Sequence, residues 1–191
     1  MAQSAFFEKT LSSECLYDGK IIHVYKDDIE LPNKNPAIRE LIRHIGGVCV
    51  IPINDKNEVI CVKQFRYPYA CDLIEIPAGK LDSKEESHRE AALRELREET
   101  GCHCEKLTYI GQMYGSPAIL DEVIYMYIAE GLSEGELDLD DDEFVELVRI
   151  PFNEIYRMVL NGEIRDAKTQ IAILKAYAFL NGEKIDIKEK E

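Results

Sequence analysis

The sequence predicts an α/β fold, an α/β/α sandwich with a mixed sheet that is preceded by a small antiparallel β-sheet. Two observations support the sandwich: β-rich runs surround one central helical segment within residues 79–102, and two further helical segments, near 153–162 and 166–181, close the chain. A third supports the separate sheet, because the first 44 residues contain strand patterns and turn signals but no helical pattern. Strands mixed with helices in this order favour helices on both faces of one sheet.

Residues 8–44 have the pattern of a three-stranded meander. The run at 9–19 ends in an Asp-Gly turn signal, the run at 20–31 follows, and "PNKNP" separates it from the run at 37–45. A sheet of this size buries too little apolar surface to be stable alone. We therefore expect two domains, 1–44 and 45–191, with the first packed on the rest of the chain or on a second copy.

The composition changes at Gly46 to that of a buried sheet followed by helices. The last helical segment begins at Asp166, a good N-cap residue, and ends at Asn181-Gly182. No internal repeat or low-complexity linker interrupts the chain. Strand-like runs occupy 46–54, 58–66, 71–79, 104–114, 121–131 and 143–152.

The charge of the chain excludes some classes of partner. A formal net charge of −14 over 191 residues argues against a nucleic acid or an anionic membrane surface. No segment approaches the roughly 18 apolar residues that span a bilayer. The start has neither the basic flank nor the apolar stretch of a signal peptide, and the six cysteines form no CxxC pair. We expect reduced thiols and a cytoplasmic location.

Carboxylates are concentrated on the central helical segment, within "GKLDSKEESHREAALRELREETGC" at residues 79–102. On a helix, Glu95, Glu98 and Glu99 share one face, where like charges repel. Hard divalent cations prefer clustered carboxylate oxygens, and Mg²⁺ shares them with substrate phosphates. Arg94, four residues before Glu98, can orient it. The pattern also fits a solvated acidic face with ion pairs between successive turns.

The order of residues in this segment resembles the Nudix box, G-x5-E-x7-R-E-U-x-E-E-x-G-U, where U is apolar. Gly79, Glu86 and the run Arg94–Gly101 match its specified positions, and Cys102 takes the last apolar place. Six residues instead of five separate Gly79 from Glu86, in a loop where insertions cost little. The resemblance implies the Nudix fold and hydrolysis of a nucleoside diphosphate linked to another group, with divalent cations held by the box.

The same resemblance implies a role for each residue of the box. Glu95 and Glu99 correspond to the main metal ligands, and Glu98 to a ligand or its close support. Family members add a backbone carbonyl near the box glycine, here that of Ala78 or Gly79. The implied cofactor is Mg²⁺, with Mn²⁺ as the alternative. Such a cation would neutralise the diphosphate and activate a water molecule.

Four segments outside the box resemble the ADP-ribose pyrophosphatase branch of the family. They are "VKQFRYP" at 62–68, "IEIPAGKL" at 74–81, "GSPAILDE" at 115–122 and "RDAKTQIAILKAY" at 165–177. The resemblance implies that the N-terminal meander forms an intertwined homodimer and that the substrate is a small nucleoside diphosphate sugar.

Three residues of these segments acquire substrate-binding roles by the same resemblance. Arg66 would contact the diphosphate or the terminal ribose, and its planar fork suits a phosphate. Glu75 would line the pocket near the metal or the adenine, and Pro117, sixteen residues after Gly101, marks the branch. The alternative for Arg66 is a surface charge at a strand end. For Glu75 it is a carboxylate turned to solvent, and for Pro117 it is an ordinary turn residue.

The acidic run 134–146, "EGELDLDDDEFVE", is in part a solvated loop. The branch supplies its catalytic base from a glutamate of this loop, and Glu143, beside the strand-like "FVELV", is the first choice. Asp141 and Asp142 are the alternatives.

For adenine, we expect side chains from the N-terminal strands, with Tyr17, Ile22 and Tyr25 as candidates. Packing in a core is the alternative for each of them.

The predicted activity is Mg²⁺-dependent hydrolysis of ADP-ribose to AMP and ribose 5-phosphate. The first alternative is a pyrophosphatase for another nucleoside diphosphate sugar, such as GDP-mannose or UDP-glucose. The second is a ligand sensor without catalysis, which the retained Glu86, Glu95, Glu98 and Glu99 disfavour.

Overall fold

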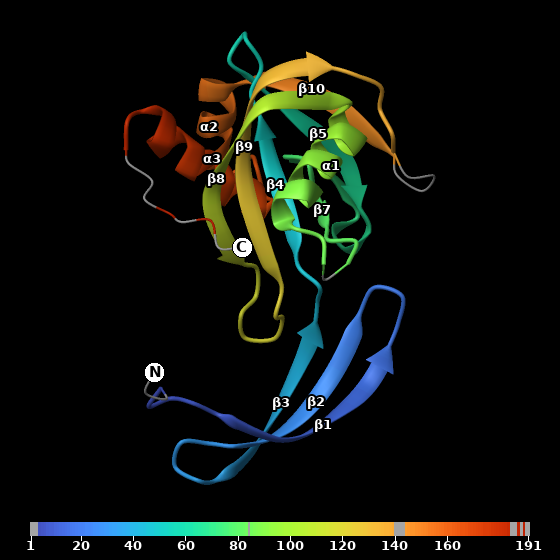
Figure 1. The fold of residues 1–191 in the computed structure, drawn as a ribbon, viewed down its shortest axis with the longest axis vertical. Coiled ribbons are helices and arrows are strands. Elements are labelled where there is room, and N and C mark those ends of the chain that lie inside the picture. Colours follow the sequence, from blue (N-terminus) through green and yellow to red (C-terminus); the bar gives the residue numbers. More distant parts are fainter. Residues whose placement is uncertain (1–3, 84, 140–143, 184–186, 188, 190–191) are drawn as a thin grey trace. The chain divides into compact units, whose positions relative to one another are not determined.

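A computed structural model describes residues 4–83, 85–139, 144–183, 187 and 189 (Figure 1). Contacts divide the chain into two compact units. The first comprises Met1–Ile45 together with Tyr114–Glu122, and the second comprises Gly46–Met113 together with Val123–Glu191. The segment 114–122, which includes one of the branch-like motifs, thus groups with the N-terminal strands.

The first unit contains the predicted antiparallel meander. Its strands β1 (Lys9–Asp18), β2 (His23–Glu30) and β3 (Pro36–Arg43) pair in the order β1-β2-β3. The segment 114–122 joins β3 through the Ile42 N–H, which donates to the Ile119 carbonyl at 2.7 Å. Strand β1 is exposed along its whole length. The unit therefore carries apolar side chains that its own packing does not cover.

The second unit is built on two sheets. In one, β4 (Gly47–Pro52) pairs with β9 (Val123–Glu134) in parallel and with β7 (Ala78–Lys80) antiparallel, which makes this sheet mixed. The order in this sheet is β7-β4-β9-β8, where β8 spans Cys102–Tyr114. The other sheet has the order β10-β5-β6. Its strands are β5 (Glu58–Arg66), β6 (Cys71–Glu75) and β10 (Val145–Pro151).

The strand-like run 71–79 is interrupted where the sequence alone indicated one element. Strand β6 ends at Glu75, and β7 begins at Ala78 in the other sheet. Pro77 lies between them. Proline has no N–H to donate to a ladder and restricts the residue before it, so the chain leaves one sheet and enters the other at this point. The break places Ala78 and Gly79 on a short separate strand.

Helices cover both faces of the mixed sheet, as predicted. Alternation along β4 sends Val48 and Val50 into one apolar cluster with residues of α1 (His88–Thr100), and Cys49 and Ile51 into another. The second cluster includes residues of α2 (Phe152–Leu160) and α3 (Ala167–Leu180). Figure 1 shows these two helices on the opposite side of β4 from α1. The second unit is therefore an α/β/α sandwich.

The ends of α1 and α3 are set by local sequence. Ser87 caps α1 in a reciprocal capping box with Glu90, and Gly101 ends the helix at φ +70°, in the left-handed region that favours glycine. Asp166 caps α3 by accepting from the Thr169 N–H at 2.8 Å, which confirms the predicted cap. These two helix ends position the charged side chains of α1 and of the first turn of α3.

Candidate functional site

Arg94 is the centre of an ion-pair network on α1. Its Nε donates to Oε1 of Glu86 at 2.9 Å, and its Nη1 donates to Glu95 at 2.7 Å and to Glu98 at 3.0 Å. Its Nη2 also reaches the carbonyl of Lys80 at 3.0 Å. The longer spacing between Gly79 and Glu86 thus does not prevent Glu86 from pairing with Arg94. Arg94 connects the loop before the helix with two carboxylates on it.

These contacts shift the pKa values of the paired groups. Burial by itself would lower the pKa of Arg94, but the hydrogen bonds and charges of Glu86, Glu95 and Glu98 outweigh it and raise the pKa. The hydrogen bond from Arg94 lowers the pKa of Glu86, against a smaller opposing effect of burial. Both groups are therefore charged at neutral pH.

Strand β7 lies directly against the carboxylates of α1. The Ala78 N–H donates to Oε2 of Glu99 at 2.9 Å. A Cβ atom added to Gly79 would be only 2.0 Å from Oε1 of Glu95, so glycine is needed for this approach. Glu95 and Glu99 are both buried, with exposed fractions of 8% and 5%. The predicted metal-ligating segments, the helix face and the Ala78–Gly79 backbone, are thus in contact.

The donor set on this face fits a hard divalent cation. Glu95, Glu98 and Glu99 supply carboxylate oxygens, and Ala78 belongs to the strand that contacts them. Across the described part of the chain, no three Asp, Glu, His or Cys side chains are arranged to hold a metal ion as they stand. In this arrangement Glu95 and Glu98 are paired with Arg94. Their role as metal ligands stays a prediction.

Arg66 and Glu75 form a bidentate pair between neighbouring strands. Nε and Nη2 of Arg66, at the end of β5, donate to the two carboxylate oxygens of Glu75, at the end of β6, at 2.7 Å each. The Glu75 side chain is 1% exposed, whereas that of Arg66 is 39% exposed. Glu75 is therefore not a carboxylate turned to solvent, and Arg66 is not an isolated surface charge.

Lys168, in the first turn of α3, is a third member of this group that sequence reasoning missed. Its Nζ donates to Oε2 of Glu75 and, at 2.9 Å, to Oδ1 of Asp166. Burial would raise the pKa of Glu75, but the Arg66 hydrogen bonds and the Lys168 charge outweigh it and lower the pKa. The Asp166 cap and the "DAKT" segment mark this turn in the sequence, but nothing local indicates a partner 93 residues away.

The remaining substrate-binding candidates, Tyr17, Tyr25 and Pro117, belong to the first unit. Tyr17 is 61% exposed, and the Arg43 guanidinium lies 4.9 Å from the centre of the Tyr25 ring. Pro117 lies in an exposed turn of the segment 114–122. Their contacts with substrate stay a prediction. Ile22, the third adenine candidate, is 48% exposed.

Glu143, the predicted catalytic base, lies outside the described residues, as do its alternatives Asp141 and Asp142. The described start of the same loop is bound to the C-terminal part of α1. The Asp138 N–H donates to the Glu98 carbonyl at 3.2 Å, and the Asp138 carboxylate pairs with Arg97 at 3.5 Å. The described start of the loop therefore lies beside the C-terminal part of α1.

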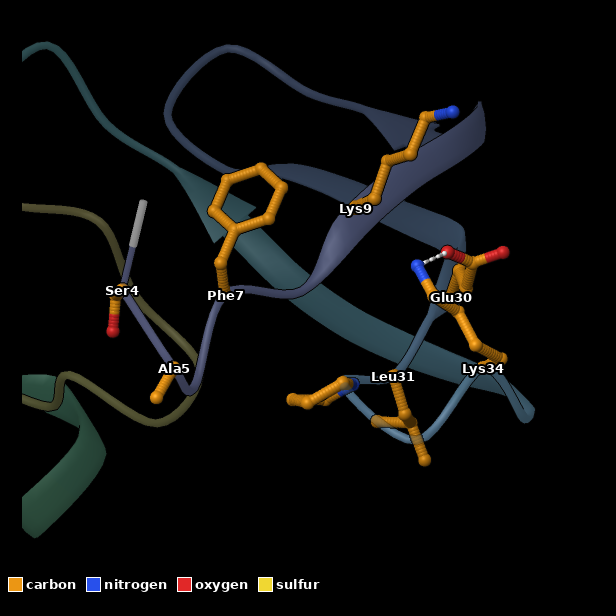
Figure 2. Close-up of a pocket in the computed structure, with 8 residues that line it drawn as sticks. Ser4, Ala5, Phe7, Lys9, Glu30, Leu31 and Lys34 are labelled. Carbon is orange, nitrogen blue, oxygen red and sulfur yellow. Dashed lines mark hydrogen bonds and ion pairs between the residues drawn. The ribbon is translucent and has the colours of Figure 1, made fainter. Parts of the chain in front are cut away.

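A pocket of about 240 Å³ lies in the first unit (Figure 2). Ser4, Phe7, Lys9 and Leu31 line it, and an ion pair of 2.8 Å between Lys34 and Glu30 crosses one side. It contains none of the residues that the sequence marked for chemistry. We therefore do not assign it to the candidate site.

Two features bear on the surroundings of the protein. Within the described ranges, no helix is long and apolar enough to span a membrane. All six cysteines are free thiols, and burial raises the pKa of both Cys49 and Cys61 to about 12.

Comparison with known proteins gives matches over both parts of the chain. The family described as "NUDIX domain" matches residues 43–171, and that described as "Nucleoside diphosphate sugar hydrolase N-terminal domain" matches residues 8–42. An "ADP-ribose pyrophosphatase" of Bacillus subtilis (strain 168) is 44% identical over 87% of this chain and 90% of its own length. A "Methanol dehydrogenase activator" of Bacillus methanolicus is 42% identical over 88% of this chain and 91% of its own.

A solved structure also resembles the chain. The structure titled "Crystal structure of ADP compounds hydrolase" matches with a TM-score of 0.83, covering 96% of this chain and 100% of that one. Its sequence is 22% identical, so the match shows a shared fold.

Proposed function

This chain belongs to the Nudix hydrolase family, and from that premise we propose that it hydrolyses ADP-ribose to AMP and ribose 5-phosphate with Mg²⁺. The observation that carries the proposal is the 44% identity to an ADP-ribose pyrophosphatase over 87% of the chain. The similarity extends over most of the chain, well beyond the box at residues 79–102. The name of the Bacillus methanolicus relative describes an effect on another enzyme and names no substrate.

We assign the cation to the face formed by Glu95, Glu98, Glu99 and the backbone of Ala78. Mg²⁺, or Mn²⁺ in its place, would supply charge neutralisation for the diphosphate and activation of water. The chain's own contribution is to keep these oxygens close together despite their repulsion. Arg94 does this through its bonds to Glu95 and Glu98, and the Ala78 N–H does it for Glu99. Arg94 is thus assigned a positioning role.

The hydrolysis requires an anion-binding group and a base. In the proposed reaction, the oxygen of a water molecule forms a bond to one phosphorus, and the bond from that phosphorus to the bridging oxygen breaks. Arg66 is assigned to the diphosphate, because its guanidinium is charged and partly exposed. Glu143 is assigned as the base that accepts the proton of the water. Its loop starts beside α1, which supports this choice over a base elsewhere.

We further propose a homodimer formed through the N-terminal strands, in a reducing, cytoplasmic setting. Large apolar side chains are exposed on the first unit, and a second copy would cover them. They include Phe6, Leu11, Leu16, Tyr17, Ile21, Ile22 and Ile38. The six free thiols support the reducing setting. The proposed domains are 1–44 for dimerisation and part of the pocket, and 45–191 for hydrolysis.

A substrate panel tests the proposed function. ADP-ribose, GDP-mannose and UDP-glucose are each incubated with the protein and Mg²⁺, and the released nucleoside monophosphate is quantified, with EDTA and Glu99→Gln as controls. We expect the highest kcat/KM for ADP-ribose, no release with EDTA, and strongly reduced release from Glu99→Gln. A higher kcat/KM for GDP-mannose or UDP-glucose would establish the alternative substrate class. Binding of ADP-ribose without release of AMP would instead support a sensor.

A further inference from the structure

We propose that Lys168 is a positioning residue for substrate binding: it holds Glu75 so that Glu75 takes one edge of the Arg66 guanidinium and leaves the other edge for an anionic group. The identity of that anion, the diphosphate of a nucleoside diphosphate sugar, rests on the proposed function. The placement of Arg66 by Lys168 rests on the structure alone.

The geometry of the Arg66–Glu75 pair determines which donors remain for a ligand. A guanidinium has five N–H donors in a planar fork. Nε and Nη2 of Arg66 each donate one to Glu75, at 2.7 Å. The outer edge, formed by Nη1 and the second N–H of Nη2, keeps the parallel donors that suit two oxygens of a phosphate. Glu75 therefore directs this edge as well as binding the other.

Lys168 makes this arrangement electrostatically possible. Asp166, Lys168, Glu75 and Arg66 alternate in sign, so their formal charges cancel. Without Lys168 the group would carry a net negative charge at the place where an anionic substrate is proposed to bind. Burial would lower the pKa of Lys168, but the charges of Asp166 and Glu75 outweigh it and raise the pKa. Lys168 therefore carries a positive charge in this group at neutral pH.

The position of Lys168 is fixed by the start of α3. Asp166 holds Nζ of Lys168 with Oδ1 and caps the helix with Oδ2, which accepts from the Thr169 N–H at 2.8 Å. The hydroxyl of Thr169 accepts from the Ile76 N–H at 3.0 Å, next to Glu75. The first turn of α3 is thus attached to the end of β6. Lys168 reaches Glu75 from a rigid support, as a positioning residue must.

The placement is tested by NMR, with no substrate present. The Nε–H of Arg66 is bonded to Glu75, so its ¹⁵Nε–¹H signal exchanges slowly with water, and loss of the signal in Arg66→Lys assigns it. We expect the signal to broaden or disappear in Lys168→Met and Lys168→Gln and to persist in Lys168→Arg. Lys175→Met, which removes an equal charge from the same helix, is the matched control and should keep the signal. All variants are compared below their own melting transitions.

The effect of Lys168 on substrate binding is measured separately, as the KM for the substrate. In Lys168→Met we expect the KM for the substrate to rise by about tenfold or more, with a smaller change in kcat, because ground-state binding of the anion is weakened. Lys168→Arg should recover most of that loss, and Lys175→Met should match the unaltered protein. A purely structural role would lower the folded fraction and kcat without raising KM or losing the Arg66 signal.

The outcomes separate this inference from the proposed function. If the unaltered protein releases no AMP from ADP-ribose, the proposed substrate is wrong, and the NMR comparison still decides the role of Lys168. A persistent Arg66 signal in folded Lys168→Met and Lys168→Gln would overturn the inference whatever the substrate is. If the KM of Lys168→Met and that of Lys168→Gln both stay within twofold of the KM of the unaltered protein, the link to substrate binding is overturned.

Discussion

The Ala78 N–H donates a 2.9 Å hydrogen bond to Oε2 of Glu99, which joins a short strand to a helix 21 residues further along the chain. With Gly79 against the Glu95 carboxylate, this bond places one backbone segment beside two of the predicted metal ligands. The bond also gives the buried Glu99 carboxylate a hydrogen-bond donor, which lowers the free-energy cost of burying its charge.

Replacing Glu99 with Gln should abolish most activity while leaving the fold intact. The amide oxygen of Gln can still accept from the Ala78 N–H, so the melting temperature should change by only a few degrees. A neutral oxygen is a poor ligand for a divalent cation, and we expect kcat to fall by roughly a hundredfold or more. Steady-state kinetics at saturating Mg²⁺, beside a thermal melt, checks both parts. Turnover near that of the unaltered protein would refute the assignment of Glu99.

Replacing Gly79 with Ala should displace the Glu95 carboxylate, since the added Cβ would be 2.0 Å from Oε1 of Glu95. We expect weaker activation by Mg²⁺ and a lower kcat. A double-mutant comparison supplies the control: once Glu95→Gln is present, Gly79→Ala should reduce kcat little further, because both act on one group. Independent, multiplying losses would show that Gly79 acts on something other than Glu95.

Glu75 should contribute to stability at neutral pH and lose that contribution in acid. Its pKa is lowered from its ordinary value of 4.5, because Arg66 and Lys168 outweigh the opposing effect of burial. The unfolded chain then binds the proton more tightly, so the contribution is present above pH 4.5 and is lost as the pH falls through the lowered pKa.

Urea unfolding between about pH 6 and pH 3 measures this contribution. In Glu75→Gln, we expect a lower free energy of unfolding at pH 6, because Arg66 and Lys168 keep their charges while the buried carboxylate between them is lost. We also expect a smaller loss of that free energy between pH 5 and pH 3. Curves that stay parallel over this interval would show that Glu75 is not the group responsible.

The exposed apolar side chains of the N-terminal strands should be needed for dimerisation. Leu16 and Ile38, with exposed fractions of 50% and 53%, lie on β1 and β3. Leu16→Glu and Ile38→Glu should shift the protein toward monomer in sedimentation velocity experiments, since an unpaired charge is costly in an interface. Leu160→Glu on α2, where leucine is 61% exposed, is the control and should sediment as the unaltered protein does. If Leu16→Glu and Ile38→Glu sediment as the unaltered protein does, this interface is refuted.

Glu143→Gln should lower kcat and leave KM for the substrate nearly unchanged, because a base acts on water in the transition state. Asp141→Asn and Asp142→Asn, measured in the same assay, are the matched comparisons. If one of those variants loses kcat and Glu143→Gln does not, the base is on this loop but at a different residue.

The sequence alone determined most of the elements and the local pattern of charge, although it joined β6 and β7 into one predicted strand. The strand predicted at 58–66 is β5, and the predicted cap Asp166 begins α3. The sharing of one helix face by Glu95, Glu98 and Glu99 follows from helical periodicity. These features depend on residues a few positions apart, where hydrogen bonding and side-chain spacing are decided by the chain itself. They could therefore be predicted before any tertiary contact was known.

Tertiary structure decided which of these elements meet. Only packing brings Lys168 of α3 to Glu75 of β6, 93 residues earlier, and places the Gly79 backbone against Glu95. The same is true of the segment 114–122, which sequence reasoning assigned to the main domain and which pairs with β3. The physical reason is that a salt bridge or a backbone contact between distant segments forms only after the apolar cores have placed their elements. No local sequence pattern identifies the distant residue with which such a contact forms.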